Sequence, residues 1–107
     1  MSKPRIWLST TSPKANEIVR VRALIEHRME TGLRPDEDGN PIARNIINLF
    51  EARINDQLLF SWHPETAISQ NPYLEFTFIA RESGTLSMKW VDDTEQVITD
   101  SAEITVS

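Results

Sequence analysis

The 107-residue sequence contains no cysteine. This absence excludes a disulfide, a thiolate nucleophile, an iron–sulfur cluster, covalently attached haem and a cysteine-ligated copper. Glycine is scarce as well, with only three residues, and Gly32 and Gly39 lie in one stretch. No run of apolar residues approaches the roughly 18 needed for a membrane-spanning helix. Thiol chemistry and a helical membrane anchor are therefore not expected.

Positive charge is also in short supply, because 11 lysines and arginines stand against 16 acidic residues, for a net charge of −5. Nucleic-acid binders and proteins of anionic membrane surfaces need a basic face, so neither partner is expected. The N-terminal sequence MSKPRIWLSTTSPK lacks the apolar run of a secretory signal. These features alone favour a cytoplasmic protein, and the length predicts a single domain over residues 1–107.

Most of the chain alternates between apolar and polar residues with the period of a half-buried strand. We expect seven strands, at residues 5–9, 18–25, 46–54, 57–62, 73–80, 85–91 and 96–106. The only helical candidate is residues 63–70, and Asn55–Asp56 reads as a hairpin turn. Short strands with almost no helix predict an all-β fold, an immunoglobulin-like antiparallel β-sandwich of about seven strands.

Residues 27–44, HRMETGLRPDEDGNPIAR, interrupt this alternation for 18 positions. The stretch holds two of the three glycines, two of the six prolines and charges of both signs. Connections of this length are uncommon in compact domains and are either functional or disordered. From the residues alone, a solvated loop and a functional loop are equally good interpretations.

The residues supply little for catalysis or metal binding. His27 and His63 each follow a predicted strand and stand near acidic residues, but they are 36 positions apart with no short ligand spacing. The acidic runs fall in predicted turns, where carboxylates are usually solvated, and no order of Ser, His and Asp indicates a nucleophile. We therefore assign no catalytic residue, no cofactor site and no metal ligand.

Two kinds of side chain are candidates for binding. Arg34 and Arg44 could recognise an oxyanion through their guanidinium groups, or could pair with the acids of their own loop. Apolar residues in the polar loop, or opposite the expected inward face of their strands, could bind a partner or be covered by the loop itself. These candidates are Met29, Leu33, Ile47, Leu49 and Ile79.

Several motifs carry a resemblance to a known family. HRMETGLR is followed by a DxxG turn at residues 36–39, by Arg44 and by NII, and further along come NPYL, ESGTL and WxDD. In this order and spacing the motifs resemble the SoxZ family of bacterial thiosulfate oxidation. The family usually reads HPMETGLR and IPR, so Arg28 and Ala43 replace two prolines here.

The resemblance implies an immunoglobulin-like, non-catalytic subunit without a cofactor. Such a subunit forms a heterodimer with SoxY, whose cysteine carries the sulfur intermediates, and other Sox enzymes dock transiently on the SoxYZ complex. The resemblance also implies a periplasmic location reached by co-export with SoxY, contrary to composition alone. Two alternatives remain: a free-standing immunoglobulin-like binding module, and a small hydrolase or metal-dependent redox enzyme.

Overall fold

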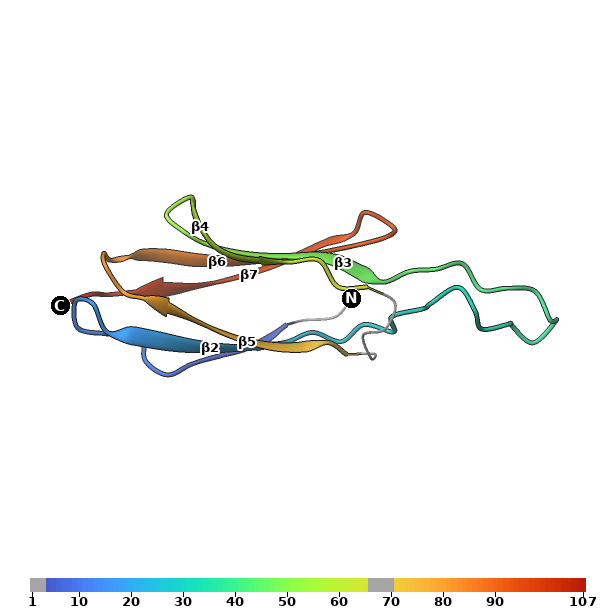
Figure 1. Cartoon of the computed structure of the whole chain (residues 1–107), viewed down its shortest axis with the longest axis horizontal. Coiled ribbons are helices and arrows are strands. Elements are labelled where there is room, and N and C mark those ends of the chain that lie inside the picture. Colours follow the sequence, from blue (N-terminus) through green and yellow to red (C-terminus); the bar gives the residue numbers. More distant parts are fainter. Residues whose placement is uncertain (1–3, 66–70) are drawn as a thin grey trace.

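The protein folds as a two-layer antiparallel β-sandwich. The computed structural model describes residues 4–65 and 71–107. A three-stranded sheet in the order β1-β2-β5 packs against a four-stranded sheet in the order β4-β3-β6-β7 (Figure 1). The strands are β1 (Arg5–Leu8), β2 (Ile18–Leu24), β3 (Ile47–Ile54), β4 (Gln57–Trp62), β5 (Tyr73–Ile79), β6 (Gly84–Asp92) and β7 (Val97–Ile104).

All seven expected strands are confirmed, with bounds that differ by two residues or fewer at each end. The helix expected at residues 63–70 is wrong over its first three positions, which have no regular secondary structure, and its remainder lies outside the described residues. No helix in the described ranges is long and apolar enough to cross a membrane.

Alternation places one row of side chains from each strand between the sheets. The outward arginines of β2 alternate with Val19, Val21 and Ala23, which are all buried as expected. At the centre, the Phe50 ring lies 5.0 Å from that of Trp90, and the ring of Phe60 stacks on Phe76 at 5.3 Å. Packed aromatic rings thus fill the core that a disulfide braces in antibody domains.

The turn between β3 and β4 shows why a two-residue connection was predictable. Asn55 and Asp56 both have positive φ, 46° and 72°, which a tight hairpin turn requires and which these residue types tolerate. The Asn55 side chain also accepts a hydrogen bond from the Thr85 amide at 3.1 Å and donates one to the Ser83 carbonyl at 3.0 Å. The turn is therefore tied to the start of β6.

The long axis of the molecule measures 59 Å, whereas the other two measure 21 and 20 Å. The longest strand has nine residues and spans only about 30 Å. Most of the remaining length comes from residues 27–45, called the arm below, which extend beyond one end of the sandwich (cyan to green in Figure 1).

Candidate functional site

The arm is a hairpin whose two halves pair with each other. Near its base, Glu30 and Asn45 exchange two backbone hydrogen bonds of 2.9 Å, and further out the Ile42 amide donates to the Arg34 carbonyl at 2.9 Å. The prolines and the left-handed backbone at Gly32, with φ +87°, limit this pairing to isolated bridges. The stretch is therefore ordered by its own backbone, although it has no strand pattern in its sequence.

The tip of the arm is the turn that the DxxG motif predicts. The Asp36 carbonyl accepts a hydrogen bond from the Gly39 amide at 3.1 Å, and Gly39 has a φ of +81°. The Asp36 carboxylate caps the turn by accepting from the amides of Asp38 and Asn40, both at 2.9 Å. The geometry thus suits an aspartate at the first position and a glycine at the fourth.

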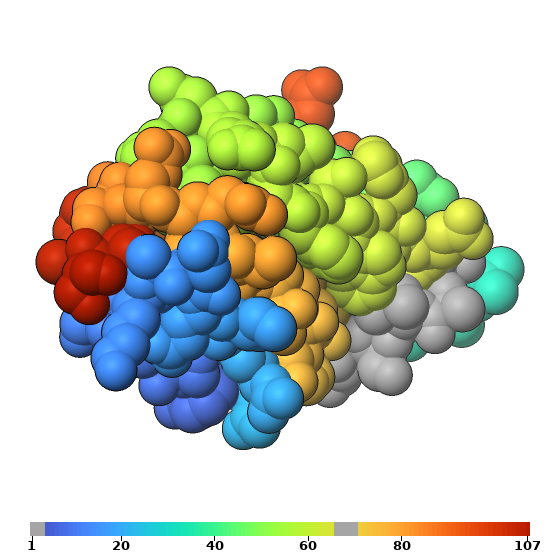
Figure 2. Space-filling model, turned by 60° about the vertical axis from the view of Figure 1, so that its left-hand side comes forward, coloured from blue at the N-terminus to red at the C-terminus, as the bar shows by residue number. Residues whose placement is uncertain are grey.

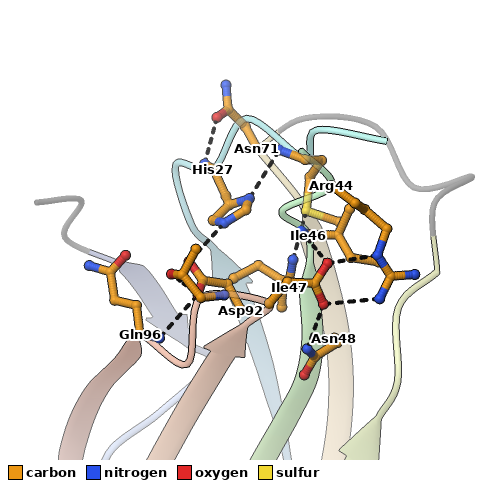
Figure 3. A network of polar contacts seen from close by, with 11 residues as sticks. His27, Arg44, Ile46, Ile47, Asn48, Asn71, Asp92 and Gln96 are labelled. Atoms are coloured by element: carbon orange, nitrogen blue, oxygen red, sulfur yellow. Dashed lines mark hydrogen bonds and ion pairs between the residues drawn. The ribbon is translucent and has the colours of Figure 1, made fainter. Parts of the chain in front are cut away.

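His27 anchors the base of the arm to the sandwich (Figure 3). Its Nδ1 accepts a hydrogen bond from the Met29 amide at 3.0 Å, so the ring proton belongs on Nε2, which donates to Asp92 at 3.2 Å. Its backbone is held by Asn71, whose amide donates to the His27 carbonyl at 2.7 Å and whose side-chain oxygen accepts from the His27 amide at 3.0 Å. One histidine therefore links the arm, the end of β6 and the segment before β5.

Asp92 is the buried polar residue at the centre of this network. Besides His27, its carboxylate accepts hydrogen bonds from the Thr94 amide at 2.9 Å, the Thr94 hydroxyl at 2.6 Å and the Gln96 amide at 3.1 Å. Burial acts to raise the pKa of Asp92, but the bonds from Thr94, His27 and Gln96 outweigh it, so its pKa lies below the ordinary value. The carboxylate is ionised and serves as a structural acceptor.

Asp93 fixes the returning half of the arm. Its carboxylate takes two hydrogen bonds from the Arg44 guanidinium, at 2.8 and 3.1 Å, and others from the Asn48 side chain at 2.9 Å and the Ile46 amide at 3.2 Å. Burial acts to raise the pKa of Asp93, but the hydrogen bonds from Asn48, Arg44 and Ile46 have the larger effect. The pKa of Asp93 therefore lies below its ordinary value. The WxDD motif thus supplies one acid to each half of the arm.

Arg34 and Arg44, the two candidate anion ligands, each have a carboxylate partner, and so does the neighbouring Arg28. Arg34 pairs with Glu30 four residues earlier, Arg44 pairs with Asp93, and Arg28 lies 3.8 Å from Glu30. The hydrogen bond from Arg34 is the main cause that lowers the pKa of Glu30. Pairing with acids therefore accounts for Arg34 and Arg44 without a ligand, and an anionic cargo at these residues stays a prediction.

The five apolar candidates do not share one surface. Leu33 on the arm is 88% exposed, Ile79 is exposed on the outer face of β5, and Leu49 is half-buried on the outer face of β3. Met29 is 4% exposed and Ile47 only 1%. Met29 lies over the end of β3, where its sulfur accepts the Ile47 amide hydrogen bond at 3.2 Å.

The outward placement of Ile47 is wrong, and a bulge is the reason. The register against β6 shifts between Ile47, which pairs with Asp92, and Leu49, which pairs with Val91. Asn48 is the extra residue, so Ile47 and Phe50 both point into the core although three positions separate them. Met29 and Ile47 therefore pack within this chain and are not available to a partner.

Within the part of the chain that the structure describes, neither histidine lies in a group of acids that could hold a metal ion. Nowhere in residues 4–65 and 71–107 do three or more side chains of His, Asp or Glu gather as ligands. His27 has both ring nitrogens engaged, and His63 lies exposed just after β4.

Fold and arm together define a small immunoglobulin-like β-sandwich domain with a projecting hairpin. Solved structures of the same architecture include superoxide reductase (neelaredoxin) from Ignicoccus hospitalis, with a TM-score of 0.69, 20% identity and coverage of 98% of this chain and 80% of that chain. The sulfur carrier protein SoxY from Chlorobium limicola f thiosulfatophilum has a TM-score of 0.65, 7% identity and coverage of 97% and 78%. At such identities the likeness concerns the fold alone.

The chain belongs to the SoxZ family. The family profile, described as Sulphur oxidation protein SoxZ, matches residues 8–103, which include both the arm and its acidic anchors. No curated protein sequence matches the chain significantly. Membership gives the chain a role in sulfur oxidation.

Proposed function

We propose that this chain is the non-catalytic subunit of a SoxYZ sulfur carrier complex in thiosulfate oxidation. Its role is to bind and support SoxY, whose cysteine carries the sulfur intermediates, while other Sox enzymes dock transiently on the complex. The observation that carries the proposal is the family match over residues 8–103.

The chemistry of the chain favours the role of a supporting subunit over that of the sulfur carrier itself. Covalent carriage of sulfur needs a thiolate, and the sequence has no cysteine. Asp92 and Asp93 have lowered pKa values, and their carboxylate oxygens accept the hydrogen bonds that hold the arm. A general acid or base would instead need a pKa near the working pH. The sulfur cargo therefore belongs on the partner.

The site of action follows from the same proposal. A subunit that binds SoxY works where SoxY works, so we place the chain in the periplasm, reached by co-export with the partner. The net charge of −5 is consistent with a protein partner and gives no support to nucleic acid.

Co-expression with a SoxY protein of the same organism tests the proposal, with a tag on this chain only. We expect SoxY to co-purify in a heterodimer. After incubation with thiosulfate and the other Sox components, intact-mass spectrometry should find the sulfur adduct on SoxY and none on this chain. A stable sulfur adduct on this chain would refute the supporting role, and failure of SoxY to co-purify would favour a free-standing binding module.

A further inference from the structure

Exposed apolar side chains are concentrated on the outer face of the three-stranded sheet, here called the β1-β2-β5 face. Among the described residues, seven large hydrophobic side chains are exposed, and four of them lie on this face. Trp7, Ile18, Tyr73 and Ile79 are each 44–64% exposed. Ile18 and Ile79 are direct cross-strand partners, and Trp7 pairs with Arg22. Figure 2 shows β2 (blue) next to β5 (yellow-orange) at the surface.

The charged groups at the centre of the β1-β2-β5 face are already held in place. The Arg22 guanidinium lies 4.7 Å from the centre of the Trp7 ring and 3.1 Å from the Glu75 carboxylate. The Tyr73 hydroxyl donates to the same carboxylate at 3.3 Å, and Arg20 lies 3.5 Å from it. The few residues that carry most of the binding energy of a protein interface are enriched in tryptophan, tyrosine and arginine. Because these side chains are ordered in advance, less entropy is lost when a partner binds them.

The charge of this face is opposite to that of the whole chain. Its strands direct Arg5, Arg20 and Arg22 outward against the single acid Glu75, a net charge of +2 on a protein of net charge −5. Two-fold pairing of identical copies through this face would oppose two positive surfaces, which is unfavourable. The matching surface is one with apolar side chains surrounded by carboxylates.

The outer face of the four-stranded sheet differs in these respects. The outward acids of its strands, Glu51 and Glu103, equal its outward bases, Arg53 and Lys89, in number. Glu51 pairs with both of these bases at 3.1 Å. Among the described residues, the exposed large hydrophobic side chains on this face are Leu58 and Val97, on the two edge strands. This face therefore serves as the natural internal control.

We propose that the β1-β2-β5 face is the surface that docks SoxY, and that SoxY meets it with an apolar patch rimmed by acidic side chains. The inference rests on the proposed function for the identity of the partner. The arm leaves the sandwich from the end of β2, so a partner on this face lies near the base of the arm as well. Of the residues considered from sequence, Ile79 belongs to the docking surface.

Two matched variants test the assignment. Ile18→Ser/Arg20→Glu removes an exposed aliphatic side chain and reverses an arginine beside Glu75. Leu58→Ser/Arg53→Glu makes the same changes beside Glu51 on the other sheet. By isothermal titration with SoxY in 0.15 M salt, we expect the first variant to raise the Kd at least roughly thirtyfold and the second less than about threefold.

A second measurement covers the case in which a variant fails to fold. Because the chain has no cysteine, Thr77→Cys and Ser87→Cys each create a single thiol, on the β1-β2-β5 face and on the opposite face respectively. With a thioether-linked environment-sensitive fluorophore, SoxY should shift the emission from position 77 and leave that from position 87 unchanged.

The outcomes separate the two proposals. If wild-type protein binds SoxY but the Ile18/Arg20 variant binds equally well, or only position 87 responds, the docking assignment is wrong and the proposed function stands. If the wild-type protein does not bind SoxY, the proposed function fails and the docking surface fails with it.

Discussion

Replacing Asp92 by asparagine changes one buried atom in the network that holds the arm. The amide oxygen can replace the oxygen that accepts from Thr94 and Gln96. The amide nitrogen then faces the Nε2 proton of His27, so two donors meet. Moving the ring proton to Nδ1 transfers the conflict to the Met29 amide, which already donates there. Either way one buried donor loses its acceptor.

The expected cost follows from that single mismatch. Leaving a buried donor without a partner costs about 1–3 kcal/mol. For a domain whose total stability is of the order of 5–15 kcal/mol, this is a large fraction. We expect Asp92→Asn to lower the free energy of unfolding by roughly 2 kcal/mol at pH 7 and the melting temperature by about 8–16 °C.

The effect depends on pH in a defined direction. The pKa of Asp92 is lower in the folded protein than in the unfolded chain, so the folded state binds fewer protons. The stabilisation by its carboxylate is complete above the unfolded pKa of about 3.9 and disappears as the pH falls through the folded pKa. The difference between wild type and Asp92→Asn should therefore be full at pH 7 and shrink below about pH 4.

Urea denaturation followed by tryptophan fluorescence at several pH values measures these differences. Asp56→Asn is the matched control, because Asp56 is an exposed turn residue with a φ of 72° that asparagine tolerates, and its change should stay within about 0.5 kcal/mol. Equal stability of Asp92→Asn and wild type at pH 7, or a difference that persists unchanged at pH 3, would refute the reasoning.

Two further variants test the bulge and the arm. Ile47→Ala should lower the free energy of unfolding, measured in urea, by about 2–4 kcal/mol, and Leu49→Ala by less than about 1 kcal/mol. The reason is that only the Ile47 side chain is fully buried. The reverse order would contradict the register shift in β3. Gly32→Ala forces a Cβ into a backbone with φ +87° and to 3.3 Å from the Arg44 Cβ. This strain of about 1–2 kcal/mol makes local opening of the arm easier, so amide hydrogen exchange at Glu30 and Asn45 should accelerate five- to thirtyfold. Unchanged protection of these amides would show that the substitution causes no such strain.

The sequence alone was sufficient to predict the architecture. Strict alternation on β2, β5 and β6 reveals which side chains are buried, because the period of a strand leaves no other way to hide every second residue. Asn55–Asp56 and the DxxG turn were predictable because few residue types adopt the positive φ that tight turns need. The motifs around METGLR indicated the SoxZ family, which the match over residues 8–103 shows.

Tertiary structure alone decided which residues are available for binding. An extra residue in β3 turned Ile47 inward, and nothing local in INLFEARI signals a bulge. The acidic partners of His27 and Arg44 are 65 and 49 positions away, beyond the reach of any spacing rule. Trp7, Ile18 and Tyr73 were not singled out from sequence, although outward positions on short strands could have indicated them.

The core was predictable and the binding surface was not because the alternation within a strand is a local property, whereas the grouping of side chains on a surface depends on distant parts of the chain. A period-two pattern reports which half of each strand avoids water, so one sequence determines its own core. Whether outward side chains gather into one patch depends on strand order and register, as when Ile18 and Ile79 meet across β2 and β5. Pairings between distant segments set that register, and only the folded chain brings them together.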